Sequence, residues 1–590
     1  MEEISTDLRP GRVGMIRHLN IGIRHVLLML SAVPAFIILL LVALILWVGL
    51  VKDVNSGIFS SGMTLDHYRA LLADPLIYRA VFNTAEFTLV AMSVAFGIGV
   101  PLAWLAERSS LPGKGVIYVL MVSGLLIPGA FIAMGWVFLF HPEIGIINTA
   151  VRSLVGSDHS VINIVTVPGM GIIQGLNLVP VVFITLGPGY RAMNPAVEEA
   201  ARVHGLSLLG TLHRISLPLL LPSIMGAFLY VLTIAIAAFD IPAIIGLSNR
   251  ILTFSTFVYI SANPREGLPN YGVVGALSSV MIFFALLSCW MYVSVLKRSY
   301  KYAVVTGQGY SSRLVKLRGK TVAVVWILIG LYFFFTIVMP VLVLVWASVM
   351  RWFRPPSLSA LKLASLGNFR DVDWSMVLVG AKNSAVLMLL VPTLVLVFSG
   401  AIAWIVVRSR FHGKVALDFS AFVPHAVPHI IFAFSILVAA LFLLQKILPI
   451  YGKLTILIVV YTLVWLAFGT RVLSSSLVQL HKELEEVGRV SGIPGRVILW
   501  KIVLPLLRPA ILSCWLWMAL LTFREFTMAA MLATTRYNMT LPIVIWSYWS
   551  GGQSGRASAV ALIGFLILVP MVAAYWIIGR RFTALGATRA

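Results

Sequence analysis

Apolar residues run through this chain in long uninterrupted stretches that short polar segments separate. A helix needs about 20 apolar residues to cross a bilayer. Stretches of that length lie at about 26–51, 83–106, 115–140, 165–187, 219–247, 271–296, 321–350, 383–407, 415–444, 454–474, 508–533 and 557–579. The strands of a membrane barrel would alternate polar and apolar residues, and these stretches do not. The pattern therefore predicts an all-α membrane protein with about twelve transmembrane helices.

Composition agrees with this prediction. Hydrophobic residues make up 60% of the 590 residues and charged residues 11%, and the mean hydropathy is +0.99. Soluble domains have about 45–50% apolar and about 25% charged residues, so a soluble fold is excluded. The first apolar stretch is longer than the roughly 7–15-residue core of a secretory signal, and no small-residue cleavage site follows it. We expect it to remain as the first helix.

The formal net charge of +23 reports topology rather than a nucleic-acid partner. No basic stripe is interleaved with the aromatic residues on which single-strand binders stack bases. Basic residues cluster instead before the first stretch, after the second, between the halves, after the eighth and at the end. With twelve spans all these clusters fall on one side, so the positive-inside rule places both termini and the central linker in the cytoplasm.

The two halves of the chain are an internal repeat. At an offset of 300, Asn83, Trp104, Arg108, Gly113 and Pro128 match Asn383, Trp404, Arg408, Gly413 and Pro428. After an extra stretch near 145–159 the offset becomes 287, and Arg202, Gly205, Pro218, Pro222 and Phe239 match Arg489, Gly492, Pro505, Pro509 and Phe526. Chance similarity between apolar helices would not preserve such residues together. Each half has about six spans, so the copies run in the same direction and a pathway between them is expected.

One short polar pattern occurs in both halves. The first copy is Glu199-Ala200-Ala201, three residues, Gly205, nine residues, and Ile215-Ser216-Leu217-Pro218; the second has Glu486-Val487-Gly488, Gly492 and Ile502-Val503-Leu504-Pro505 at the same spacing. A glutamate near the start of a helix favours the positive end of its dipole. A glycine lets the chain turn sharply or approach a partner closely. An amphipathic connector is the alternative, but the duplication favours two loops outside the bilayer that another protein grips.

This spacing resembles the signature loop of the permeases of prokaryotic ATP-binding-cassette importers, although Val487 and Gly488 replace two alanines of that signature. Segments 65–84 and 366–384 resemble this family's entry into the permease core. The resemblance implies a type I binding-protein-dependent importer whose two permease domains are fused. The length and the stretch 524–526 resemble ferric-iron permeases most, with relatives for phosphonates, polyamines and thiamine as alternatives. Ferric iron is the substrate that the resemblance implies.

The resemblance also implies a domain organisation and a set of contact residues. We expect a cytoplasmic N-terminal segment at 1–25, a first permease half at 26–297 with a coupling loop at 190–218, a basic cytoplasmic linker at 298–320, a second permease half at 321–581 with a coupling loop at 475–505, and a cytoplasmic tail at 582–590. The residues expected to couple to an ATPase are Glu199, Ala200, Ala201, Gly205, Ile215, Leu217, Pro218, Glu486, Gly492, Ile502, Leu504 and Pro505.

The chain lacks the phosphate-binding loop of an ATPase. The nearest approach is Gly319-Lys320-Thr321, but Leu314 stands where that loop requires its first glycine. We therefore expect no cofactor in this chain: ATP and Mg²⁺ would be bound by two copies of a cytoplasmic ATP-binding subunit. A periplasmic or extracytoplasmic substrate-binding protein would dock on the opposite face of a bacterial inner-membrane permease.

Two other function classes fit the sequence less well. A membrane-embedded enzyme would carry paired aspartates, His-Glu-x-x-His or a Ser/His arrangement, and the spans contain none of these. A secondary transporter driven by an ion gradient would place coupling carboxylates near mid-membrane, where few are present, and would not need a duplicated Glu-Gly loop. The sequence therefore favours a transport subunit that is not an enzyme.

Few charged residues lie within the apolar stretches. Asp240, Arg524 and Glu525 follow the two Leu-Pro tails by roughly 18–22 residues, and Asp240 aligns with Thr527. Charges at such positions are costly and usually face a cavity or a partner. They are candidates for the translocation pathway, an outer gate or the docking face. A structural ion pair or anchoring at the lipid headgroups is the alternative.

A pair of histidines invites comparison with a metal site. His425 and His429 are four residues apart and could share a helical face, as metal ligands do. Two prolines interrupt that helix, no carboxylate or cysteine accompanies the pair, and the first half has no histidine at the equivalent positions. We expect no metal site there. Pro128 and Pro428 are instead predicted to kink equivalent helices in both halves.

Overall fold

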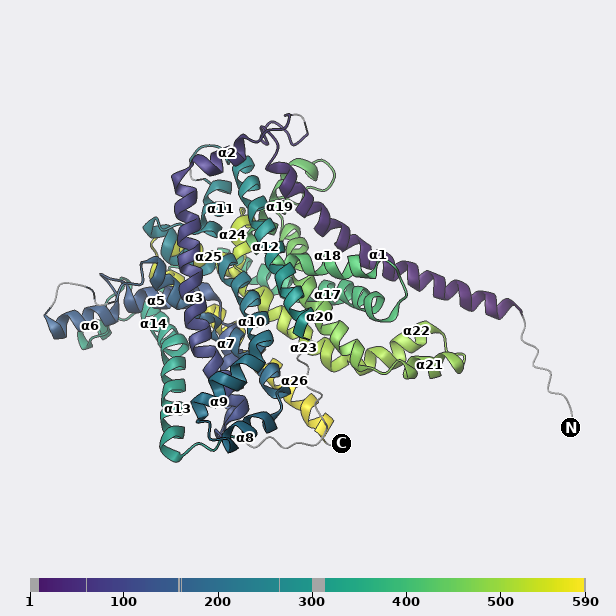
Figure 1. Ribbon diagram of the computed structural model, residues 1–590. Coiled ribbons are helices and arrows are strands. Elements are labelled where there is room, and N and C mark those ends of the chain that lie inside the picture. Colours follow the sequence, from purple (N-terminus) through teal and green to yellow (C-terminus); the bar gives the residue numbers. More distant parts are fainter. Residues whose placement is uncertain are drawn as a thin grey trace.

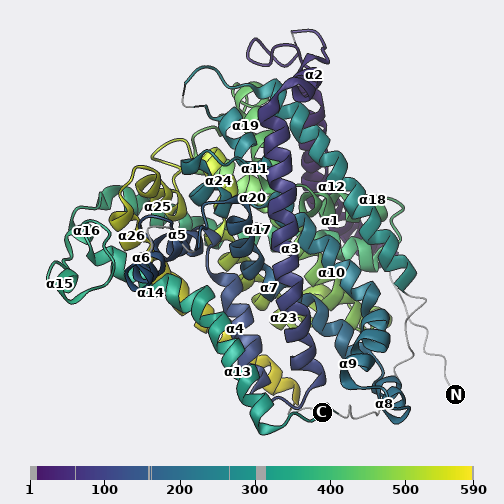
Figure 2. The same ribbon diagram turned by 60° about the vertical axis from the view of Figure 1, so that its left-hand side comes forward.

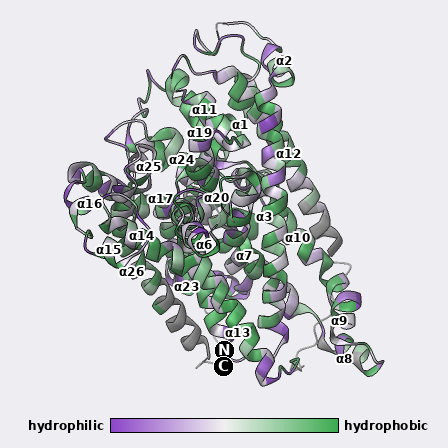
Figure 3. Ribbon diagram, turned by 90° about the vertical axis from the view of Figure 1, so that its left-hand side faces the viewer, coloured by the Kyte–Doolittle hydropathy of each residue, from purple (hydrophilic) through white to green (hydrophobic). Residues whose placement is uncertain are grey.

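The computed structural model describes residues 10–59, 61–156, 160, 162–264, 266–299 and 314–587. Within these residues the chain is helical, without strands and with two isolated bridges. Ten of the described helices are long and apolar enough to cross a membrane, or up to twelve if each of two bent pairs counts as one span. The predicted all-α membrane protein is confirmed. Figure 3 shows hydrophobic residues along the lengths of the long helices.

The two halves repeat the same order of long helices. The first half comprises α1 (Pro10–Val48), α2 (Asp66–Ala73), α3 (Pro75–Arg108), α4 (Lys114–Leu126), α5 (Gly129–Phe140), α6 (Ile146–Val155), α7 (Val167–Ala192), α8 (Pro195–Val203), α9 (Leu208–Thr211), η1 (Leu212–Ser216), α10 (Leu217–Ala237), η2 (Pro242–Gly246), η3 (Leu247–Asn249), α11 (Phe254–Ala262) and α12 (Tyr271–Ser299). Most of the expected linker at 298–320 lies outside the described residues.

The second half begins at Gly319 and ends in a long C-terminal helix. It comprises α13 (Gly319–Phe333), η5 (Phe334–Val338), α14 (Met339–Val349), α15 (Leu358–Leu361), α16 (Gly367–Arg370), α17 (Trp374–Arg408), α18 (Lys414–Ala426), α19 (His429–Val438), η6 (Ala439–Leu443), α20 (Leu454–Gln479), α21 (Glu483–Val490), α22 (Gly495–Ile498), η7 (Leu499–Val503), α23 (Leu504–Arg524), α24 (Thr527–Leu532), α25 (Leu541–Ser550) and α26 (Ser554–Ala587).

The repeat extends to individual hydrogen bonds. In each half the side chain of an asparagine and that of the following threonine or serine fasten the long core helix to the start of a later helix. The bonds run from Asn83 Nδ2 to Leu252 O (2.8 Å), from Phe254 N to Thr84 Oγ1 (2.7 Å), from Asn383 Nδ2 to Met539 O (2.9 Å) and from Leu541 N to Ser384 Oγ (2.9 Å). The sequence repeat is therefore a structural repeat.

One pair of membrane helices is sharply bent at the equivalent proline in each half. α4 and α5 meet at 94°, and α18 and α19 meet at 105°. Ile127 and Val427, which precede Pro128 and Pro428, have extended ψ angles of 129° and 134°. A proline ring disfavours the helical conformation of the residue before it, so the helix must end there. The predicted kinks are confirmed, and they are full breaks rather than gentle bends.

A second pair of breaks lies farther along each half. The residue after the end of α10, Ala238, has a ψ of 131°, and the residue after the end of α23, Glu525, has a ψ of 113°. These two residues are equivalent at the offset of 287. The apolar stretches expected at 219–247 and 508–533 are therefore discontinuous helices. In transporters such breaks commonly surround the substrate pathway, because unwound backbone is tolerated there.

The two halves are interleaved by exchange of their first helices. α1 packs against α17, α18 and α19 of the second half, and Ser435 Oγ donates a hydrogen bond of 2.7 Å to Leu41 O. In return, α13 packs against the first half, where Tyr332 donates from its hydroxyl to Leu176 O at 2.9 Å. α1 and α13 lie on opposite sides of the molecule in Figure 1. Each half is therefore covered in part by the first helix of the other half.

Both Glu-Gly loops lie toward the same side of the bundle. Figure 1 shows α8, α9, α21, α22 and the end of α26 along its lower and right-hand margin, and α2 and α6 along its upper and left-hand margin. The view turned by 60° again places α8 and α9 at the lower end and α2 at the upper end (Figure 2). This arrangement is the one that a parallel repeat requires.

Candidate functional site

Each Glu-Gly loop contains a short helix that ends at its glycine. Gly205 and Gly492 have φ angles of +84° and +74°, a region that other residues rarely adopt. The next amide reaches back across the turn, from Leu206 N to Ala201 O at 3.1 Å and from Ile493 N to Gly488 O at 2.9 Å. A Cβ on either glycine would meet nothing within 4 Å. The backbone conformation, rather than crowding within the chain, therefore requires glycine here.

The Leu-Pro tails begin the next membrane helix through a widened turn. Leu217 N donates to Leu212 O, and Leu504 N donates to Leu499 O, five residues back. The following residues, Pro218 and Pro505, have no N–H, and in an ordinary α-helix their rings would clash with the carbonyl four residues before them. Both copies therefore contain a single π-helical turn, η1 and η7, at the same position of the repeat. Such turns are uncommon and often lie at functional sites.

An exposed apolar stripe runs along the short helix of each loop. Positions three residues apart share one helical face. In the first half these are Val197, Ala200 and Val203, and in the second half Leu484, Val487 and Val490, all exposed. Val203 and Val490 are 85% and 89% exposed. Apolar side chains displayed this fully on a polar helix, at matching positions in both halves, form a surface suited to a protein partner.

The opposite face of each short helix carries a buried glutamate that the sequence motif did not single out. Glu198 forms an ion pair of 2.8 Å with Arg108, and Glu485 forms one of 2.7 Å with Arg408. All four side chains are almost fully buried. Glu199, the motif residue, is partly exposed, and Glu486 is exposed. The signal that could have identified the pairs is the recurrence of Glu198 and Arg108 at equivalent positions of the second half.

The second loop also borders a groove of about 560 Å³. Gly488 lies in it where the first half has Ala201, and a Cβ on Gly488 would approach Ile498 Cδ1 to 3.0 Å. The glycine at position 488 of the second copy therefore has a packing reason. The groove is lined by His481, Glu483, Leu484, Val487, Gly488, Ser491, Ile493 and Ile502.

A polar cluster lies where the two halves meet beyond the breaks in α10 and α23. Thr527 donates from its hydroxyl to Asp240 Oδ1 at 3.3 Å, and the rings of Phe239 and Phe526 are 5.6 Å apart. Each of these contacts joins a residue to its own counterpart in the other half. Two equivalent residues that touch must lie close to the axis that relates the halves, so this cluster is on that axis.

Arg524 and Glu525 have separate partners. Arg524 donates to Leu125 O, a carbonyl that the break after α4 leaves without a helical partner. Glu525 is buried, lies 3.3 Å from His429 Nδ1, and accepts from Met528 N at 3.1 Å. Among the described ion pairs none joins Arg524 to Glu525. The pair considered as a structural alternative is therefore not formed in the described residues.

The two histidines of the second half face different neighbours. His425 stacks on Tyr230 of the first half, with ring centroids 5.0 Å apart, while His429 lies against Glu525 and Trp465. The described residues contain no group of three or more His, Cys, Asp or Glu side chains that could hold a metal ion. Both rings contribute instead to contacts around the breaks at Val427 and Glu525.

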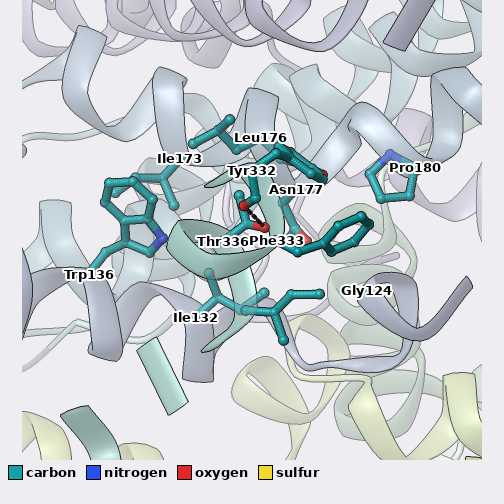
Figure 4. A pocket seen from close by; sticks show the side chains of 11 residues that line it. Gly124, Ile132, Trp136, Ile173, Leu176, Asn177, Pro180, Tyr332, Phe333 and Thr336 are labelled. Atoms are coloured by element: carbon teal, nitrogen blue, oxygen red, sulfur yellow. Dashed lines mark hydrogen bonds between the residues drawn. The ribbon is translucent and has the colours of Figure 1, made fainter. Parts of the chain in front are cut away.

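A small crevice lies where α13 and η5 of the second half pack against the first half (Figure 4). Two of its hydroxyl groups are hydrogen-bonded within the chain: Tyr332 donates to Leu176 O, and Thr336 donates to Tyr332 O at 2.7 Å. The predicted site residues do not line it. The lining residues are Gly124, Ile132, Trp136, Ile173, Leu176, Asn177, Pro180, Tyr332, Phe333, Thr336 and Ile337.

Known proteins match this chain over most of its length. The profile described as binding-protein-dependent transport system inner membrane component matches residues 99–299 and 396–584, one region in each half. The ferric transport system permease protein FbpB of Actinobacillus pleuropneumoniae is 24% identical over 520 residues, which cover 86% of this chain and 72% of that protein. The Fe(3+)-transport system permease protein FbpB 2 of Haemophilus influenzae is 23% identical over 497 residues, which cover 84% and 88%.

Other matches are shorter or more distant. The spermidine/putrescine transport system permease protein PotB of Escherichia coli is 28% identical over 238 residues, covering 38% of this chain and 82% of that protein. Among solved structures, a bacterial ABC transporter for alginate aligns with a TM-score of 0.30 at 19% identity, over 42% of this chain and 86% of that one.

Proposed function

This chain belongs to the family of binding-protein-dependent transport system inner membrane components, and we propose that it imports ferric iron with the help of two ATPase subunits and a binding protein. It is a fused permease of an ATP-binding-cassette importer, a multi-pass inner-membrane protein rather than a catalytic subunit. In the proposed orientation the termini and both loops are cytoplasmic. ATP and Mg²⁺ belong to the two ATPase subunits, and the binding protein docks on the opposite face.

The exposed apolar stripe, which occurs in both halves, supports the proposal that α8 and α21 bind the ATPase subunits. Two equivalent helices with exposed apolar residues at matching positions suit two copies of one partner. The test is co-purification of the ATPase with Val203→Asp, Val490→Asp and the double variant. A carboxylate in an apolar interface should remove most of the bound ATPase, with one copy lost in each single variant. Val155→Asp, at a valine of α6 that is 69% exposed, is the control; equal loss there, or none in the double variant, contradicts docking at the stripe.

Support for ferric iron comes from the two FbpB relatives, each of which covers more than four fifths of this chain. The polyamine permease PotB covers little more than a third of it. The test is uptake into proteoliposomes that contain the permease, its ATPase and its binding protein, with labelled Fe³⁺ or labelled spermidine supplied outside. We expect ATP-dependent uptake of iron alone. Uptake of spermidine without iron would overturn the choice of substrate and leave the importer class intact.

The cluster on the axis between the halves is the proposed gate. Phe239 and Phe526 meet at the axis, and Asp240 and Thr527 join the halves beside them. Arg524 and Glu525 hold the adjoining breaks. In a variant without the native cysteines, the substitutions Asp240→Cys and Thr527→Cys introduce two thiols that can form a disulfide. This disulfide should stop transport until a reductant is added. The single Asp240→Cys variant is the control. Full transport by the cross-linked protein would exclude a gate at this position.

A further inference from the structure

The buried arginine in the first half joins three elements at one point. Arg108, at the end of α3, contacts Glu198 on α8 at 2.8 Å and donates to Met193 O, beyond the end of α7, at 3.4 Å. Glu198 accepts a further hydrogen bond of 2.6 Å from Ser216 Oγ, in the π-turn that begins α10. The short helix is therefore tied by directional, charge-assisted bonds to the ends of two membrane helices and to the start of a third.

The second half builds the same junction from equivalent residues. Arg408, at the end of α17, contacts Glu485 on α21 at 2.7 Å. Its guanidinium also donates to Leu477 O at 2.9 Å and to Leu480 O at 2.7 Å, at the end of α20. Arg489 adds a second cation 3.3 Å from Glu485. The two junctions differ in their secondary contacts but share the arginine, the glutamate and the helix ends that they join.

An ion pair buried this deeply is not the simplest way to hold a fold together. Removing two charges from water is costly, and well-packed apolar side chains often stabilise as well or better. Apolar contacts, however, are not directional and allow one element to slide over another. A fork of hydrogen bonds from an arginine holds both distance and orientation. This difference matters where a displacement must be passed from one element to the next.

We propose that Arg108–Glu198 and Arg408–Glu485 are positioning pairs that pass the displacement of α8 and α21 to the membrane helices. The proposal rests on the proposed function, in which the exposed face of each short helix receives an ATPase. The opposite face is fastened by these pairs to α3 and α7 or to α17 and α20. In the first half Ser216 extends the junction into α10, which leads to Phe239 and Asp240 at the axis. The four residues position the coupling helices and do not themselves touch substrate.

The test compares single and double neutral variants in the assembled transporter. Arg408→Gln leaves Glu485 buried without its main partner and should lower the melting temperature. Arg408→Gln/Glu485→Gln removes both charges and should restore much of that stability. We expect the double variant still to bind its ATPase and hydrolyse ATP, but to move about tenfold less substrate per ATP, the loss that a single charge-assisted hydrogen bond can represent. Arg108→Gln/Glu198→Gln should behave alike.

Another ion pair supplies the matched control. Asp418 on α18 and Arg471 on α20 form an ion pair of 3.3 Å outside both coupling loops, so Asp418→Asn/Arg471→Gln should leave the substrate moved per ATP unchanged. If the double variants recover both stability and the ratio of substrate to ATP, or fail to fold at all, the pairs are structural and the proposal is wrong. If the unmodified chain binds no ATPase, the proposed function fails instead, and the two results cannot be confused.

Discussion

At the scale of single residues, neighbours in each Glu-Gly loop have opposite surroundings. Glu198 and Glu485 are buried against arginines, whereas Glu199 is partly exposed and Glu486 is exposed. Adjacent residues of an α-helix, with 3.6 residues per turn, point in directions about 100° apart, so they fall on different faces. The inner glutamate holds the short helix to the membrane domain, and the outer one is available to a partner.

The loop glycines give a prediction at the same scale. Leucine at φ values near +80° costs about 1–2 kcal/mol, so Gly205→Leu and Gly492→Leu should distort the turns and weaken ATPase attachment without preventing membrane insertion. Co-purification of the ATPase and transport are the measurements. Gly156→Leu is the control, because Gly156 has a φ of +68° and open space at the end of α6. A double loop variant with full attachment would show that the turn conformation does not matter for docking.

At the scale of elements, two pairs of equivalent prolines mark where helices end or begin. Pro128 and Pro428 break spans into pairs bent by 94° and 105°. Pro218 and Pro505 instead lie where η1 and η7 run into α10 and α23 without a break. The widened turns η1 and η7 accommodate the missing N–H of these prolines. At Pro128 and Pro428 the preceding residue is extended and the helix ends, whereas at Pro218 and Pro505 the preceding residue is helical and the helix continues through a widened turn.

The π-turns give a prediction at this scale. Pro218→Ala or Pro505→Ala restores an N–H and permits an ordinary helix, which should raise the free energy of unfolding by up to about 3 kcal/mol. Loss of the extra residue per turn would rotate the loop relative to α10 or α23 by about 100°, so transport should fall while the melting temperature rises. Pro222→Ala, four residues farther into α10, is the control. Unchanged transport in both π-turn variants would show that these turns serve no coupling role.

At the scale of the whole molecule, the halves are interleaved rather than side by side. α1 packs on the second half and α13 on the first, so a relative movement of the halves must carry the exchanged helices with it. The residues in direct contact with their own counterparts, Phe239 with Phe526 and Asp240 with Thr527, lie at the centre of this arrangement. A movement that separates the halves has to open these contacts.

The parallel arrangement gives a topological prediction. In a variant without native cysteines, a cysteine at exposed Ser207 or Ser491 should react with an impermeant thiol reagent only from the cytoplasm, because both lie in the loops. A cysteine at exposed Ser359, on α15, should react only from outside. Labelling in spheroplasts and in inverted vesicles measures both. Labelling of Ser207 and Ser491 from opposite sides would mean that the halves are inverted.

The sequence alone determined the features that are local or periodic. Apolar length sets the spans, a proline fixes a helix break through its own backbone, and the Glu-Gly spacing marks two loops because helix and turn geometry depend on near neighbours. The repeat also identified Asp240 and Thr527 as equivalent. None of these required knowledge of which helices touch.

Only the tertiary structure decided which surfaces meet. The partner of Arg108 lies 90 residues away on α8, and the choice of Glu198 over adjacent Glu199 depends on the rotation of that helix against α3. The same holds for Arg524 and Glu525, which are consecutive but bind Leu125 O and His429 rather than each other. The exchange of α1 and α13 and the contact of Phe239 with Phe526 follow from how whole helices pack. Packing depends on faces brought together from distant parts of the chain, and no local pattern encodes that.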